Sequence, residues 1–133
     1  MASGRSWGRL TRRPEFLRVA ASRRRWAAPG LILQVAESPS SEPQSPFRLG
    51  FTASRKVGGA VQRNRARRRL KAAAVEVMPA HAAPGMDYVL VARAETVTRP
   101  YAGLLGDLET ALRRLKLWRE AAAAPAPAAR EGR

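Results

Sequence analysis

A run of cationic side chains is the part of this sequence whose residue types and spacing are best suited to chemistry. Between Arg55 and Lys71, eight of 17 residues are Lys or Arg and none is acidic. Like-charged pairs four residues apart on a helix each cost roughly 0.2–0.5 kcal/mol. A solvated surface helix is the plain alternative, but such helices usually interleave charges of both signs. We therefore predict that this run binds phosphates and forms a nucleic-acid surface.

On a helical wheel the run divides into an apolar stripe and cationic rows. The stripe would face a core and contains Ala66, Leu70, Ala73, Ala74 and Val77. The rows are Arg63–Arg67–Lys71, Asn64–Arg68 and Arg65–Arg69. Because no row carries a glutamate, we expect a polyanion to neutralise them.

The positive charge of the whole chain is concentrated in the half that contains this run. The formal net charge is +15, and residues 1–71 hold 17 Lys and Arg against three acids, whereas residues 72–133 hold eight against seven. The excess therefore lies in the first half of the chain, and a polyanionic partner would relieve its self-repulsion. Arginine makes up 22 of the 25 cations, and its planar guanidinium suits phosphate contacts.

The residues alone leave the kind of nucleic acid open. Helix-turn-helix, zinc-finger and leucine-zipper patterns do not occur, whereas RNA-binding proteins often stack unpaired bases on aromatic rings. Phe16 and Phe51 are candidates for such stacking, although core packing is the simpler expectation for Phe51. A ribosomal-type structural RNA-binding protein fits the composition equally well. A DNA-compacting protein fits it less well, because the charge is confined to one half.

Candidate catalytic groups are few. The single histidine, His81, lies in an Ala/Pro-rich segment, and no acidic residues accompany it at metal-ligand spacing. Asp87 precedes a predicted strand and is a lone candidate for a carboxylate near phosphate-bound metal. Phosphate-loop and nucleophile-elbow patterns do not occur. We predict no catalytic residue and no metal ligand in the polypeptide.

Composition also indicates a compartment. The sequence has no cysteine, which excludes disulfides and thiolate metal sites, and no apolar run reaches the ~18–20 residues that span a bilayer. The basic start lacks the apolar segment of a secretory signal, and an organelle transit peptide is the alternative there. We expect an intracellular, cytoplasmic protein with no membrane partner.

Hydrophobic patterning predicts one small domain over residues 9–119, between a flexible basic tail at 1–8 and a disordered Ala/Pro-rich tail at 120–133. Trp7 falls in the basic tail, where we expect no packing partner for its ring. The expected helices are a short one that begins near Pro14 and includes the run Arg23–Arg25, a second over 60–77 that ends before Pro79, and a leucine-striped third over 101–115. The expected strands are 31–36, 47–54 and 88–92. Together they predict an α+β sandwich of helices against a small sheet.

The segment from Arg48 to Arg68, RLGFTASRKVGGAVQRNRARR, resembles the signature of the bacterial ribonuclease P protein component. In that family a strand ends in a Ser-Lys/Arg-Lys-Val-Gly turn, and a helix with the tripeptide Arg-Asn-Arg follows. Here the turn is Ser54–Gly58 and the tripeptide is Arg63–Arg65. The segment Arg12–Val19 is similar to the family's first helix, and the resemblance covers residues 9–118.

The resemblance implies a two-layer α+β sandwich of roughly four strands, similar to the second domain of a ribosomal protein, with the Arg-Asn-Arg helix in a left-handed βαβ crossover. It implies a protein subunit of ribonuclease P, which assists the endonucleolytic removal of the 5′ leader from precursor tRNA. In that family the RNA subunit is the catalyst, and the Mg²⁺ it needs is held mainly by that RNA and the substrate. The implied partners are ribonuclease P RNA and precursor tRNA, and no DNA.

The resemblance also assigns site residues. Those that would face the RNA subunit are Arg55, Lys56, Arg63, Asn64, Arg65, Arg67, Arg68 and Lys71. A cleft between the first helix and the sheet would hold the single-stranded leader and would include Arg12, Phe16, Phe51 and Ser54.

Four features depart from the family pattern. Ala20 stands where a second aromatic residue is common, and the first strand, Leu31–Ala36, has no aromatic residue. Gly59 replaces an asparagine in the turn, and Lys71-Ala72 replaces a closing Arg-Glu pair. We expect weaker binding of the leader than in the family at large, or a contribution from Phe51.

Overall fold

The computed structural model describes residues 7–39 and 47–120. The described elements are β1 (Gly8–Arg9), α1 (Arg13–Ala21), β2 (Arg24–Ala27), β3 (Leu31–Glu37), β4 (Phe47–Thr52), the 3₁₀ turn η1 (Arg55–Val57), α2 (Ala60–His81), β5 (Met86–Ala92), the 3₁₀ turn η2 (Ala94–Thr96) and α3 (Tyr101–Arg114). Most of both predicted tails lies outside the described residues.

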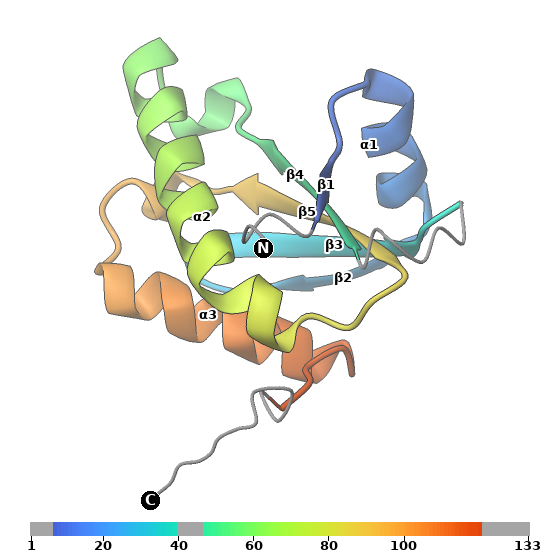
Figure 1. The fold of residues 1–133 in the computed structure, drawn as a ribbon. Coiled ribbons are helices and arrows are strands. Elements are labelled where there is room, and N and C mark those ends of the chain that lie inside the picture. Colours follow the sequence, from blue (N-terminus) through green and yellow to red (C-terminus); the bar gives the residue numbers. More distant parts are fainter. Residues whose placement is uncertain (1–6, 40–46, 121–133) are drawn as a thin grey trace, which may run out of the picture.

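The strands form one mixed sheet in the order β1-β4-β5-β3-β2 (Figure 1). β1, β4 and β5 run parallel, β3 pairs antiparallel with β5, and β2 pairs antiparallel with β3. β5 lies at the centre and is buried except at Val91, which explains its continuous apolar sequence. The α+β class is confirmed, with five strands instead of about four because β1 and β2 add an edge strand on each side.

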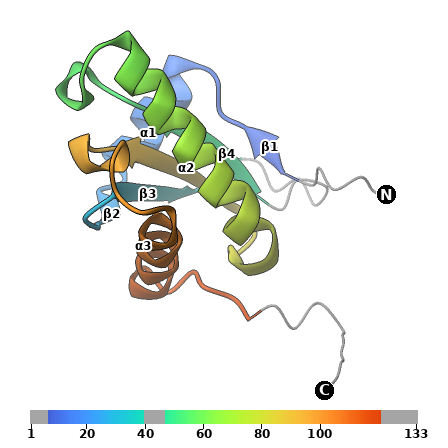
Figure 2. The ribbon, with the colours of Figure 1, turned by 90° about the vertical axis from the view of Figure 1, so that its left-hand side faces the viewer.

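Helices cover both faces of the sheet, which is one layer more than the two we expected. α1 packs on one face over a small cluster of Leu10, Val19, Ala36 and Val89. α2 and α3 pack on the other face over the main core, which includes Leu33, Leu49, Leu70, Tyr88 and Leu108. Figure 2 shows α3 nearly along the line of sight and α2 running across it, so the two helices cross on this face.

α2 connects the parallel neighbours β4 and β5, as the resemblance implied. In Figure 1 both strands run to the left, β5 lies below β4, and α2 passes in front of the sheet. A connection with this geometry is left-handed, against the strong right-handed preference of βαβ units. The basic helix therefore lies across the face of the sheet on the side of β1 and β4.

The first helix is shorter than we predicted, and the arginine run belongs to a strand. α1 ends at Ala21, and the Ser22 hydroxyl lies 2.7 Å from the carbonyl oxygen of Val19 and 2.6 Å from that of Val35. Arg23 then takes a left-handed φ of 62°. The chain turns there, and Arg24–Ala27 pairs with β3. Helical periodicity was misleading because it does not register the contact between Ser22 and a strand further along the chain.

α2 continues to His81, although we predicted an end before Pro79. Proline removes one backbone hydrogen bond of a helix and disfavours the helical conformation of the residue before it. Met78 is that residue, and it is fully buried in the main core. Its carbonyl oxygen accepts a hydrogen bond from the Ala82 amide at 2.9 Å. Tertiary packing of the last turn therefore holds the helix through the proline.

Trp7 and Gly8, which we expect in the flexible basic tail, are part of the described fold. Trp7 stacks on Phe47 with its ring centroid 6.1 Å away and an interplanar angle of 4°. The next two residues form β1, with Gly8 opposite Arg48 and Arg9 opposite Leu49. The expectation that Trp7 has nothing to pack on was wrong, because its partner lies about 40 residues further along the chain.

Candidate nucleic-acid interface

The eight residues predicted to face RNA lie on α2 and on the turn before it. They are Arg55, Lys56, Arg63, Asn64, Arg65, Arg67, Arg68 and Lys71. Six of them are exposed, and Arg63 and Arg67 are half-buried. Over residues 7–39 and 47–120, the ion pairs to carboxylates use other arginines, so the seven cations of this set have no acidic partner.

Local hydrogen bonds hold the turn against the helix. The Ser54 hydroxyl accepts from the Lys56 amide at 3.3 Å, and the Arg63 guanidinium donates to the Gly58 carbonyl at 3.0 Å. Gly58 has a φ of 143°, a conformation that side-chain-bearing residues rarely adopt. The turn thus places its two cations beside the N-terminal end of α2, whose dipole adds to the positive field.

Arg69 is an exception among the arginines of α2. Its guanidinium donates to the carbonyl oxygen of Val97 at 2.6 Å and to that of Arg99. These contacts tie the helix to the segment between η2 and α3. The helical wheel puts Arg69 in a row with Arg65 on the predicted phosphate-binding face. Because its guanidinium donates hydrogen bonds within the protein, Arg69 has a structural role.

Phe16 lies between α1 and the sheet, where the resemblance placed the leader cleft. Its half-buried ring packs against the cluster formed by Leu10 and Val89. The backbone of Gly50 lies directly beneath it, because an ideal Cβ on Gly50 would be 2.6 Å from Phe16 Cε1. The aromatic ring is therefore seated on β4, on the face that α1 covers.

The sheet beside Phe16 is only partly covered. Ile32, Thr52 and Val91 are half-buried and sit at paired positions of β3, β4 and β5. Strand alternation directs their side chains to the α1 face, opposite the main core. This strip is apolar enough to pack against unstacked bases, although it lacks an aromatic residue as the sequence indicated.

Phe51 does not share this site with Phe16. Phe51 packs against the main core under α2, on the opposite face of β4. Adjacent strand residues point to opposite faces, and Gly50 already faces Phe16. Our grouping of both phenylalanines in one leader cleft was therefore wrong, and Phe51 cannot replace the missing aromatic residue there. Arg12 is the exposed N-cap residue of α1, and Ser54 is the N-cap residue of η1, the turn that follows β4.

Asp87 anchors α1 to the sheet. Its buried carboxylate accepts from the Arg48 guanidinium at 2.9 and 2.7 Å and from the Ser38 hydroxyl at 2.7 Å, and it also pairs with Arg18 of α1. Burial alone would raise the pKa of Asp87, but the hydrogen bonds and the two positive charges hold it below its ordinary value. These contacts occupy both oxygens, so the geometry explains Asp87 as a structural residue and not as one beside a metal.

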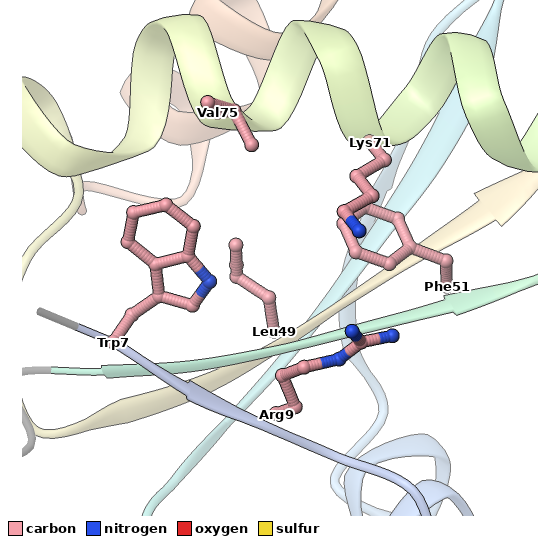
Figure 3. A pocket seen from close by; sticks show the side chains of 6 residues that line it. All are labelled: Trp7, Arg9, Leu49, Phe51, Lys71 and Val75. Carbon is pink, nitrogen blue, oxygen red and sulfur yellow. The ribbon is translucent and has the colours of Figure 1, made fainter. Parts of the chain in front are cut away.

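A groove between β1, β4 and α2 is a feature that our sequence reasoning missed (Figure 3). Two adjoining hollows share Arg9, Leu49, Phe51 and Lys71. One hollow, of about 20 Å³, is bounded by Trp7 and Val75, and the other, of about 200 Å³, extends to Leu10, Arg67 and Arg68. The sequence signal was the alternation Trp7-Gly8-Arg9, but two paired residues are too few to be recognised as a strand.

Metal-ligating side chains do not gather in the described part of the chain. No three His, Cys, Asp or Glu residues there could hold a metal ion together. His81 stacks on Trp118 with ring centroids 3.9 Å apart, and its Nδ1 lies 2.7 Å from the Arg119 carbonyl oxygen. Among these same residues, no helix combines the length and apolarity needed to cross a bilayer.

Comparison with known proteins gives one consistent result. A family model described as Ribonuclease P matches residues 6–116. The ribonuclease P protein component of Paramagnetospirillum magneticum is 55% identical over 120 residues, which cover 90% of each protein. The protein component of Caulobacter vibrioides is 47% identical over 104 residues, covering 78% of this chain and 68% of the relative.

Solved structures agree in fold. The RNase P protein of Staphylococcus aureus superposes with a TM-score of 0.68 at 22% identity, covering 84% of this chain and 97% of that one. The RNase P protein from Thermotoga maritima superposes with a TM-score of 0.63 at 21% identity, covering 81% of this chain and 94% of the other.

Proposed function

This chain belongs to the family of bacterial ribonuclease P protein components, and we propose that it binds the RNA subunit through α2 and the 5′ leader of precursor tRNA beside α1. It is the RNA-binding protein component of ribonuclease P and takes part in tRNA processing. The two proposed contacts lie on opposite faces of one sheet. The protein would therefore bridge the RNA subunit and its substrate.

The proposed contact with the RNA subunit is supported chiefly by the uncompensated charge of α2. Its exposed cations and those of η1 have no carboxylate partner in the described part of the chain. The opposite side of the helix is fixed by Leu70, Ala74 and Met78, which are fully buried. A rigid row of guanidinium groups is suited to a phosphate backbone, and it would bind with a steep salt dependence.

The proposed leader contact is supported by the half-buried ring of Phe16 and the partly covered strip beside it. A single-stranded leader presents unstacked bases, and an aromatic ring stacks any base without reading its sequence. Arg12, at the first turn of α1, would meet the phosphates of the same strand. One aromatic residue instead of several predicts modest leader affinity.

The chemical step is proposed to belong to the RNA subunit. No three His, Cys, Asp or Glu side chains of the described residues could hold a metal ion together, and the cationic face is suited to binding phosphates. Mg²⁺ would be held mainly by the RNA subunit and the substrate phosphates, where it would polarise the scissile phosphate and activate water. The contribution of this chain is to lower phosphate repulsion and to position the leader.

Cleavage of 5′-labelled precursor tRNA at low Mg²⁺ tests this proposal. The assay compares the ribonuclease P RNA of Paramagnetospirillum magneticum alone, this protein alone, and the two together. We expect that only the mixture cuts at the mature 5′ end. If the mixture cleaves no better than the RNA while the protein still binds it, the protein is a structural RNA-binding protein of the ribosomal type and the proposal is wrong.

A further inference from the structure

We propose that the groove between β1, β4 and α2 binds an unpaired nucleotide of the RNA subunit, with the base on Phe51 in the larger hollow and beside Trp7, and with the phosphate among Arg9, Arg68 and Lys71. This inference rests on the proposed contact between α2 and the RNA subunit, and it assigns a specific nucleotide site to that contact. The leader contact beside α1 is separate from it.

The register of the sheet places the aromatic and cationic groups in one groove. Arg9 pairs with Leu49, and Gly8 between Trp7 and Arg9 faces Arg48 on the α1 side, where an ideal Cβ on Gly8 would lie 3.1 Å from Arg48 Cγ. Trp7 and Arg9 therefore point to the side of α2. Figure 3 shows Trp7 and Phe51 on either side of Leu49, with Arg9 and Lys71 reaching into the space between the strands and α2.

The lining has the two kinds of surface that a nucleotide needs. Trp7, Leu49 and Phe51 form an apolar strip, and Trp7 is held in place by its stack on Phe47. Four cations surround the strip: Arg9, Arg67, Arg68 and Lys71. No acidic residue lines either hollow. A purely apolar peptide would leave these charges uncompensated, whereas an anionic aromatic ligand satisfies both surfaces.

The position of the groove favours the RNA subunit, and not the leader, as its ligand. Lys71, Arg67 and Arg68 belong to the face of α2 that carries the uncompensated charge, so the groove continues that surface. Phe16 and the half-buried strip beside α1 lie on the other face of β4. A strand bound beside Phe16 would have to pass around the edge strand β1 to reach Phe51.

Paired leucine substitutions test the site by affinity. Trp7→Leu and Phe51→Leu keep an apolar side chain but remove the ring, and each is expected to weaken binding of the Paramagnetospirillum magneticum ribonuclease P RNA at least about fivefold. Trp26→Leu is the matched control, because Trp26 lies on the opposite edge strand β2 with Arg114 over its ring. Lys71→Gln should also weaken binding, whereas Lys116→Gln, after α3, should not. Equal affinity of the Trp7, Phe51 and Trp26 variants would overturn the site.

A second measurement does not depend on how well the leucine variants fold. The protein with Trp26→Phe and Trp118→Phe retains Trp7 as its single tryptophan, and a base held beside the indole should quench its fluorescence. We expect quenching by the RNA subunit with the same midpoint as binding. An unchanged signal at saturating RNA subunit, or quenching by precursor tRNA alone, would contradict the assignment. If the unmodified protein fails to bind the RNA subunit, the proposed function itself fails; if it binds with Trp7 unaffected, only this inference fails.

Discussion

The ring of Phe16 rests on the backbone of Gly50, and a methyl group on Gly50 would lie 2.6 Å from Phe16 Cε1. Only glycine allows the first helix to place an aromatic ring this close to β4. This contact brings together the first helix and the strand of the signature, which are far apart in the sequence. It also fixes which face of the sheet the leader would use.

Gly50→Ala is expected to displace Phe16 and to weaken the leader contact. Overpacking of this kind costs roughly 1–3 kcal/mol, so the free energy of unfolding should fall and cleavage of precursor tRNA should slow at low substrate concentration. The control is Gly106→Ala in α3, where a Cβ meets nothing within 4 Å and helix propensity should improve. Chemical denaturation and single-turnover cleavage measure the two effects. A Gly50→Ala protein with unchanged unfolding and cleavage would show that the ring tolerates displacement.

Phe16→Leu is expected to remove the stacking of the leader while leaving RNA-subunit affinity unchanged. One aromatic–base stack is worth roughly 1–3 kcal/mol, which corresponds to about a thirtyfold loss in affinity for precursor tRNA at the middle of that range. The loss should disappear for a tRNA without a leader, since the contact is then absent in both proteins. Titration of the assembled enzyme with both substrates gives the answer, and an equal loss for both would place Phe16 away from the leader.

Arg65→Ala and Arg68→Ala should weaken binding of the RNA subunit and reduce its salt dependence. Each lost phosphate contact should flatten the slope of log affinity against log salt by roughly 0.7–0.9. Arg69→Ala is the internal comparison, because its guanidinium donates to the carbonyl oxygens of Val97 and Arg99. Its main effect should be on thermal stability, with the salt slope unchanged. The opposite pattern, with a flattened slope for Arg69 alone, would mean that the wrong face of α2 meets the RNA.

Asp87→Asn is expected to loosen α1 from the sheet. Removing one partner of a buried ion pair costs about 3 kcal/mol when the other charges stay behind, and here Arg18 and Arg48 would stay. Glu109→Gln, which breaks the exposed pair with Arg113, should change the unfolding free energy by less than about 0.5 kcal/mol.

The effect of Asp87→Asn should depend on pH. The pKa of Asp87 is lowered in the folded protein, so its stabilisation is fully present above the unfolded value of about 3.9 and is lost as pH falls through the folded value. The difference between the variant and the unmodified protein should be largest near neutral pH and shrink below about pH 4. Urea unfolding at several pH values measures it, and a constant difference would mean that charge is not the cause.

Local patterns in the sequence determined most of the secondary structure, the fold class and the location of the cationic surface. The period of apolar residues in α2 and α3, the alternation in β4 and the uncompensated arginines depend only on near neighbours in the chain. These features predicted the α+β class and the exposed basic helix, and the signature identified the family that the comparisons then showed. The stripe of Ala66, Leu70, Ala73 and Ala74 is fully buried, as its spacing indicated.

Other features were decided only by contacts between distant segments. β1 is too short to be recognised alone and forms because Trp7 packs on Phe47 and β4 offers an open edge. α2 passes Pro79 because Met78 is held in the core. Phe16 and Phe51 are separated by the sheet because the chain places α1 and α2 on opposite faces. Each depends on which segments meet in space, and no local period in the sequence encodes that.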